Sequence, residues 1–78
     1  MTEPAASGVP HHWPPVVVHH VVEASPPFRH VDILGTQVGK AHNVRDVVEF
    51  CRRAGLGEVD LDAEDTVQWI GGGPEVWE

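Results

Sequence analysis

The sequence predicts a small α+β domain in which one amphipathic helix packs on one face of a three- to four-stranded, mostly antiparallel sheet. Three observations support this prediction. Residues 43–56 have helical periodicity, short segments rich in β-branched residues lie before and after them, and glycine- and proline-rich turns separate these segments. The expected order is strand, strand, strand, helix, strand, which is an α+β arrangement.

The predicted helix, NVRDVVEFCRRAGL, has recognisable signals at both ends. Asn43 is a favourable N-cap, and Asp46 three residues later completes a pair that resembles a capping box. Gly55 stands where a glycine ends a helix in a Schellman motif. The apolar stripe consists of Val44, Val47, Val48, Cys51 and Ala54. We expect Val48 at the centre of this stripe and Phe50 nearer its edge.

Four segments are expected to form strands: 16–23, 29–34, 37–41 and 66–70. The first, VVVHHVVE, presents valines on both faces, because neighbouring strand residues point to opposite sides. In the second, Val31 and Ile33 share one face. Gly35 and Thr36 predict a tight reversal, or else one longer strand with a bulge at Gly35. Gly39 indicates a place where the third strand passes close to the helix.

Length and charge limit the class of protein. Seventy-eight residues form one small domain, which we assign to residues 16–78, preceded by a flexible arm at residues 1–15 that is rich in proline. A net charge of −7 makes nucleic acid an unlikely partner. No apolar segment is long enough to span a membrane, and the single cysteine excludes an intrachain disulfide. Because residues 1–15 also lack the features of a secretory signal, a cytoplasmic location is expected.

Six histidines in so short a chain raise the hypothesis of a metal site. If the first two strands pair antiparallel, His20 lies opposite Asp32 and near His30. Two imidazoles and a carboxylate suit zinc or another divalent ion, although a register slip of one residue separates them. Surface imidazoles on a half-exposed sheet are the simpler interpretation. No other cofactor is expected.

Enzymatic activity is uncertain from the sequence, and the residue spacing argues against it. Cys51 lies on the apolar stripe of the helix, where a thiol is usually buried and unreactive. No glycine-rich phosphate loop and no serine in a catalytic context accompanies the histidines.

We therefore expect a small non-catalytic protein-interaction module that forms a homodimer or binds a partner protein. One helix can cover only one face of so small a sheet, so valines on the other face need another cover. The predicted interaction residues are Trp13, Val16, Val18, Val22 and Trp77, with Val17 and Val21 as the alternative valines. Tryptophan is frequent at binding hot spots, yet Trp13 or Trp77 can equally fold back over the sheet. A histidine-based metal or small-ligand site is the alternative function.

Overall fold

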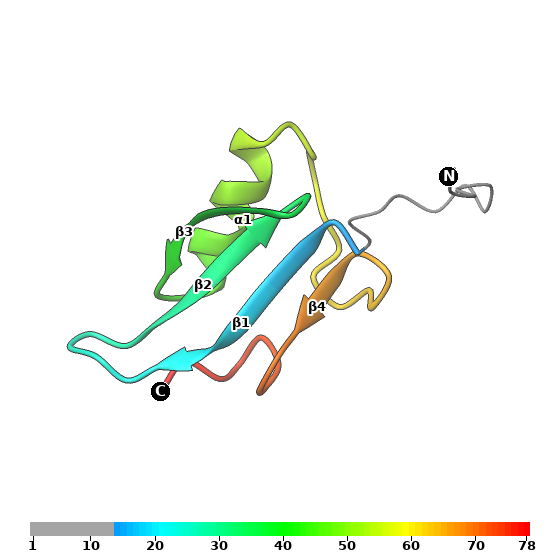
Figure 1. Ribbon diagram of the computed structural model, residues 1–78. Coiled ribbons are helices and arrows are strands. Elements are labelled where there is room, and N and C mark those ends of the chain that lie inside the picture. Colours follow the sequence, from blue (N-terminus) through cyan, green and yellow to red (C-terminus); the bar gives the residue numbers. More distant parts are fainter. Residues whose placement is uncertain (1–13) are drawn as a thin grey trace, which may run out of the picture.

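A computed structural model describes residues 14–78, which form a four-stranded mixed sheet with one helix (Figure 1). The elements are β1 (Val16–Val22), β2 (Phe28–Ile33), β3 (Thr36–Ala41), α1 (Val44–Arg53) and β4 (Val67–Trp69). The predicted α+β class and the predicted order of elements are confirmed. Two of the eight strand ends coincide with the predicted ones and the other six differ by one residue, where turn residues compete with strand pairing.

The strands lie in the order β3-β2-β1-β4. The pairs β1–β2 and β2–β3 are antiparallel, whereas β1 and β4 are parallel, with Val16 opposite Val67 and Val18 opposite Trp69. The chain leaves the sheet after β3, forms α1 and returns beside β1. The sheet is therefore mostly antiparallel, as predicted, with one parallel pair at its edge.

The β2–β3 hairpin closes through Leu34 and Gly35, which lie between the paired residues Ile33 and Thr36. Both have positive φ, 52° and 84°, as a two-residue type I′ turn requires. The reversal therefore falls one residue earlier than Gly35–Thr36. A register shift follows it, because Val31 pairs with Gly39 while Asp32 pairs with Gln37, which leaves an extra residue in β3 as a bulge.

The helix begins and ends as its sequence predicts. The Asn43 side chain accepts a hydrogen bond of 3.0 Å from the Asp46 backbone, while Asp46 Oδ2 accepts one of 2.8 Å from His42 N–H. At the other end, Leu56 N–H donates to the Cys51 carbonyl across 3.0 Å, and Gly55 has φ of 81°. These are the features of a Schellman motif.

The sequence predicted that Val48 lies at the centre of the helix's apolar face, and the structure shows that this prediction is wrong. Val47 and Cys51 are buried, whereas Val48 is 36% exposed. Phe50 instead packs against β3, and a Cβ on Gly39 would approach its ring to 2.7 Å. The close approach that Gly39 permits turns the Phe50 side of the helix toward the sheet and turns Val48 away.

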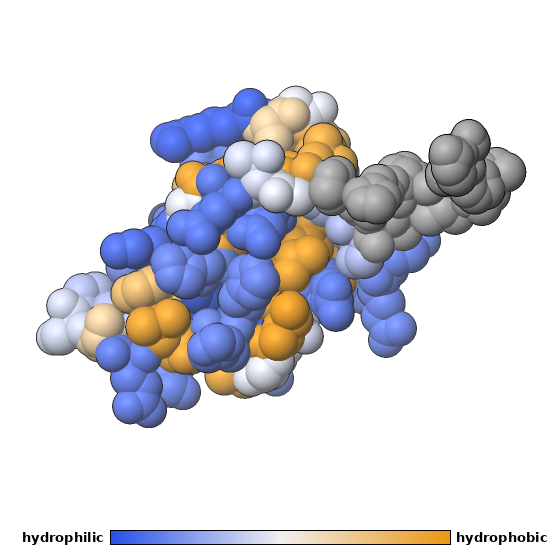
Figure 2. Space-filling model, in the orientation of Figure 1, coloured by the Kyte–Doolittle hydropathy of each residue, from blue (hydrophilic) through white to orange (hydrophobic). Residues whose placement is uncertain are grey.

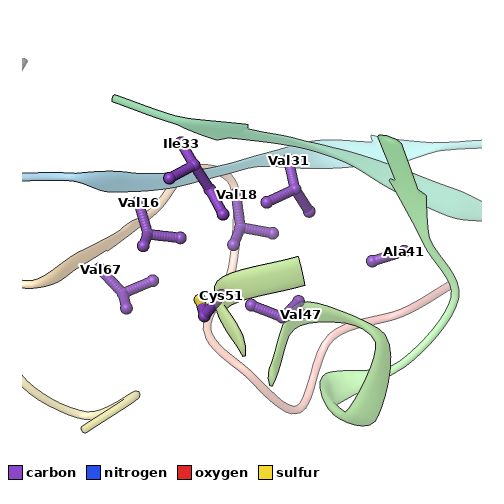
Figure 3. Packing of buried hydrophobic residues seen from close by; sticks show 8 residues of the cluster. All are labelled: Val16, Val18, Val31, Ile33, Ala41, Val47, Cys51 and Val67. Carbon is purple, nitrogen blue, oxygen red and sulfur yellow. The ribbon is translucent and has the colours of Figure 1, made fainter. Parts of the chain in front are cut away.

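The hydrophobic core lies between the sheet and α1 (Figure 3). Its buried members are Val16, Val18, Val31, Ile33, Ala41, Val47, Cys51 and Val67. Small β-branched side chains dominate, so the sheet and helix approach closely. Residues of the connection to β4, among them Leu56 and Leu61, pack against its margin.

Arg29 is the only charged or polar residue buried among residues 14–78, with no exposed surface. It lies on the same face of β2 as Val31 and Ile33, so its side chain enters the interior. Five backbone carbonyls surround the guanidinium. Its nitrogens donate to the carbonyls of His19 (2.7 Å), Ile70 (3.0 Å), Gly72 (2.7 Å), Gly73 (2.9 Å) and Val76 (2.7 Å). All five N–H donors of the guanidinium therefore have a partner.

Two tryptophans complete the enclosure of Arg29. The guanidinium carbon lies 5.3 Å from the centre of the Trp69 ring and 5.4 Å from that of Trp77, within the range of a cation–π interaction. The two rings meet edge to face, with centroids 6.3 Å apart. Burial lowers the pKa of Arg29, and the charge of Glu75 partly opposes this. A guanidinium nevertheless stays protonated at neutral pH, so the fold encloses a positive charge that carbonyl dipoles solvate.

The segment 70–77, which we call the C-terminal clasp, owes its path to glycine. Gly71 and Gly72 have φ of 81° and 135°, a region that side chains rarely allow. A Cβ on Gly72 would also come within 2.9 Å of Val76. Trp77 Nε1 donates to the Pro74 carbonyl across 2.7 Å and so holds the end of the clasp. These glycines thus allow the clasp to turn four of its carbonyls, those of Ile70, Gly72, Gly73 and Val76, toward one cation.

Replacing Arg29 with methionine should destabilise the fold by about 3 kcal/mol or more, because several carbonyls then lose their only donor in a buried place. This loss is a large share of the total free energy of unfolding, which is roughly 4–12 kcal/mol for a chain of this length. Urea unfolding followed by tryptophan fluorescence measures the change. The exposed Arg45 provides the matched control, and Arg45→Met should cost less than about 0.5 kcal/mol. Equal stability losses for the two variants would contradict the role of Arg29.

A second pair of variants tests the orientation of α1. Val47→Asp buries a carboxylate without a partner and should abolish cooperative unfolding. Val48→Asp places the same group at the helix surface and should cost about 1 kcal/mol or less. Thermal unfolding by circular dichroism separates the two outcomes. The orientation would be incorrect if Val48→Asp were the more damaging change.

Candidate functional site

One face of the sheet carries neither α1 nor the clasp. Both of these elements pack on the face of β2 that bears Arg29 and Val31, and in Figure 1 the sheet lies in front of α1. The strand pairings place the other side chains together on the opposite face, which we call the helix-free face. Its residues are Val17, His19, Val22, Phe28, His30, Asp32, Gln37, Lys40 and Gln68. Figure 2 views this side, where hydrophobic side chains interrupt a hydrophilic surface.

An imidazole–carboxylate pair lies on the helix-free face. His19 Nε2 is 2.9 Å from Asp32 Oδ2, and the two side chains are 36% and 28% exposed. The register of β1 against β2 shifts between Val18 and Val21, so a bulge lies at the His19 position. Asp32 pairs with Val17, and strand alternation places His19 on the same face as Val17, so the imidazole meets a carboxylate of the neighbouring strand.

Aromatic and basic side chains form a second group on this face. The Phe28 ring meets His30 edge to face, with centroids 5.1 Å apart, and Lys40 Nζ lies 4.7 Å from the Phe28 centroid. His42, just beyond β3, also faces Phe28 at 6.4 Å. His30 Nδ1 is enclosed, and no described residue hydrogen-bonds to it. The face therefore combines an apolar ring with several imidazoles around it.

This arrangement does not bring a nucleophile to the imidazoles. Cys51 lies in the core on the other side of the sheet, where burial raises the pKa of its thiol. A buried thiol with a raised pKa holds little thiolate at neutral pH. The His19–Asp32 pair can orient an imidazole and accept a proton, but it has no reactive thiol beside it.

The predicted metal ligands do not form a group. His19, rather than His20, reaches Asp32, because the register pairs Val17 with Asp32 and strand alternation places His19 on the same face as Val17. His20 is exposed and lies beside Gly71 of the clasp, so close that a Cβ added at Gly71 would be 2.9 Å from the His20 Cβ. Within residues 14–78, no three histidine, cysteine, aspartate or glutamate residues are placed to hold a metal ion.

The predicted interaction residues lie in different places. Val16 and Val18 have no exposed surface and belong to the core, so they are occupied within the fold. Val22 is half-buried and lies on the helix-free face opposite Phe28, and Trp77 is half-buried against Arg29. Trp13 lies outside the described residues. Of the alternative valines, Val17 is on the helix-free face; the bulge moves Val21 to the other face, opposite Arg29.

The net charge is divided unevenly along the chain. Residues 1–53 contain five acidic and five basic residues, whereas residues 54–78 contain seven acidic residues and no lysine or arginine. The whole excess of −7 therefore lies after α1, in the connection to β4 and in the C-terminal clasp. The helix-free face has one lysine and one aspartate and is close to neutral.

Comparisons with known proteins supply no relative: no protein family, no curated protein and no solved structure matches this chain. Within residues 14–78, α1 is too short to cross a membrane, and no other helix is present.

The pKa of Cys51 gives a test of whether its thiol is available. Because burial raises this pKa, the folded state keeps the thiol protonated while the unfolded chain ionises it. The free energy of unfolding should therefore fall as the pH rises above about 8.5–9, and Cys51→Ala should lessen this slope. A thiol reagent at neutral pH should react only after urea is added. Rapid labelling of the folded chain would show instead that Cys51 is accessible.

Proposed function

We propose that this chain is a small non-catalytic interaction module that binds a second copy of itself through the helix-free face. One observation carries the proposal: the sheet has a full layer on one side and no layer from the described residues on the other. Val17, Val22 and Phe28 on the open side are each only half-buried. Apolar side chains on an open sheet face favour burial against another surface.

The charge distribution supports a second copy as the occupant. Lys40 and Asp32 balance each other on the helix-free face, while the acidic excess lies beyond residue 53. Two such faces can approach without strong repulsion. In a two-fold arrangement the same residues meet from both sides, so the aromatic and imidazole groups around Phe28 supply contacts twice.

The remaining features suit such a module. Arg29 has no free donor, and Cys51 is buried, so neither is available for chemistry with a substrate. A free cysteine also suits a reducing compartment, and we infer a cytoplasmic location on that ground.

Sedimentation of the full chain tests the proposal directly. We expect a dimer at micromolar concentrations and a monomer for Val17→Lys, because each copy then brings a long, charged side chain into the apolar contact between the two faces. Asp32 and Gln68 flank Val17 in the sheet, so the new ammonium finds polar neighbours within the monomer and the fold should survive.

Val48→Lys is the matched control, since Val48 is exposed on α1, away from the helix-free face. This variant should sediment like the parent chain. The proposal fails if the parent is a monomer throughout the concentration range, or if Val48→Lys dissociates the dimer and Val17→Lys does not.

A further inference from the structure

The outer edge of β4 is free of any strand of residues 14–78. β4 pairs with β1 alone. Val16 N–H donates to the Thr66 carbonyl (3.2 Å), and Ile70 N–H donates to the Val18 carbonyl (2.9 Å). In a parallel pair alternate residues bond to the same neighbour, so residues 66, 68 and 70 face β1. The backbone groups of Val67 and Trp69 therefore point outward, and of these the Val67 N–H bonds to the Ala63 carbonyl at 3.0 Å.

A hollow of about 480 Å³ follows this edge. Its lining consists of Pro14, Glu64, Val67, Gln68 and Trp69. Consecutive strand residues point to opposite faces of a sheet, so a hollow that touches all three residues of β4 runs along the backbone and not over one face. Space for another chain thus lies beside the Trp69 N–H and the Val67 and Trp69 carbonyls, which pair with no strand of the described residues.

The surroundings of this edge are acidic. Glu64 lines the hollow, and Asp65 precedes β4 by two residues. Both are exposed, as are Glu58, Asp60 and Asp62 in the same connection. The basic side chains that contact carboxylates among the described residues are His19, His42, Arg52 and Arg53, and none of them contacts this connection. The carboxylates are therefore available to a cationic partner.

The other edge of the sheet differs. β3 carries Lys40 and a bulge, two features that hinder pairing with another chain. β4 has neither a lysine nor a bulge. A second copy is a poor occupant for the β4 edge, because two acidic edges repel each other. Residues 1–13 contain no lysine or arginine and so lack the complementary charge.

We propose that the β4 edge binds an extended, lysine- or arginine-rich segment of a partner protein by strand addition. The Trp69 N–H and the carbonyls of Val67 and Trp69 supply the backbone hydrogen bonds, and the carboxylates around Glu64 select basic side chains. The inference goes beyond self-association and does not depend on it, since the helix-free face is a different surface. Because β4 has only three residues, binding is weak and gains much of its strength from charge.

A short synthetic peptide of alternating lysine and valine serves as the probe. Nuclear magnetic resonance titration of the full chain should give saturable shifts at Val67–Trp69 and slower hydrogen exchange at the Trp69 backbone amide. The same peptide with glutamate in place of lysine should not bind. A peptide with proline at its central position should bind more weakly, because proline removes a donor.

Glu64→Lys should weaken binding by about fivefold, since it replaces an attraction with a repulsion at a partly screened site. The matched control Glu23→Lys makes the same charge change in the β1–β2 loop and should leave the affinity within about twofold. The proposal is overturned if the basic peptide does not bind at millimolar concentration, or if Glu23→Lys weakens it equally. Shifts spread over the acidic connection without protection of the Trp69 amide would also overturn it. A monomeric parent chain would leave this test unchanged.

Discussion

The enclosure of Arg29 by five carbonyls is the interaction on which the rest of the structure depends. Burying a positive charge away from solvent costs much free energy unless its N–H groups find acceptors and nearby dipoles or charges stabilise it. Here the compensation comes from the C-terminal clasp and from the carbonyl of His19, so one side chain fixes β2, the bulged part of β1 and residues 70–76 together. The positions of Trp69 and Trp77 follow, because both rings pack on the same guanidinium.

Periodicity and turn chemistry predicted the fold class, the order of elements and both helix ends. They could do so because these features are local: Asn43 and Gly55 have their roles within one turn of α1. The orientation of the helix face was predicted incorrectly. Which of Val48 and Phe50 faces the sheet depends on how closely α1 approaches Gly39, and that distance is set by tertiary packing.

The candidate site was less accessible from the sequence. Strand alternation places His19 on the face of Val17, but the register that pairs Val17 with Asp32, and so brings His19 rather than His20 to Asp32, depends on contacts between strands that the sequence does not specify. The role of Arg29 had two signals: its parity with Val31 and Ile33, and a glycine triplet followed by tryptophan near the end of the sequence. Neither signal indicates that Arg29 contacts the glycine segment, because 41–47 residues separate Arg29 from the clasp carbonyls. By contrast, the concentration of the acidic excess in residues 54–78 can be read directly from the sequence.

The long separation between Arg29 and its clasp carbonyls also bears on the order in which the fold forms. The β1–β2–β3 meander and α1 rest on contacts that are short in sequence, and such contacts form early. Four of the five carbonyl partners of Arg29 belong to residues that follow β4, so during that stage only the His19 carbonyl is close to it in the sequence. Closing so large a loop carries an entropic cost that no local contact offsets. Folding therefore transfers one cation from water to peptide carbonyls, and the same contacts bring Trp69 and Trp77 out of solvent.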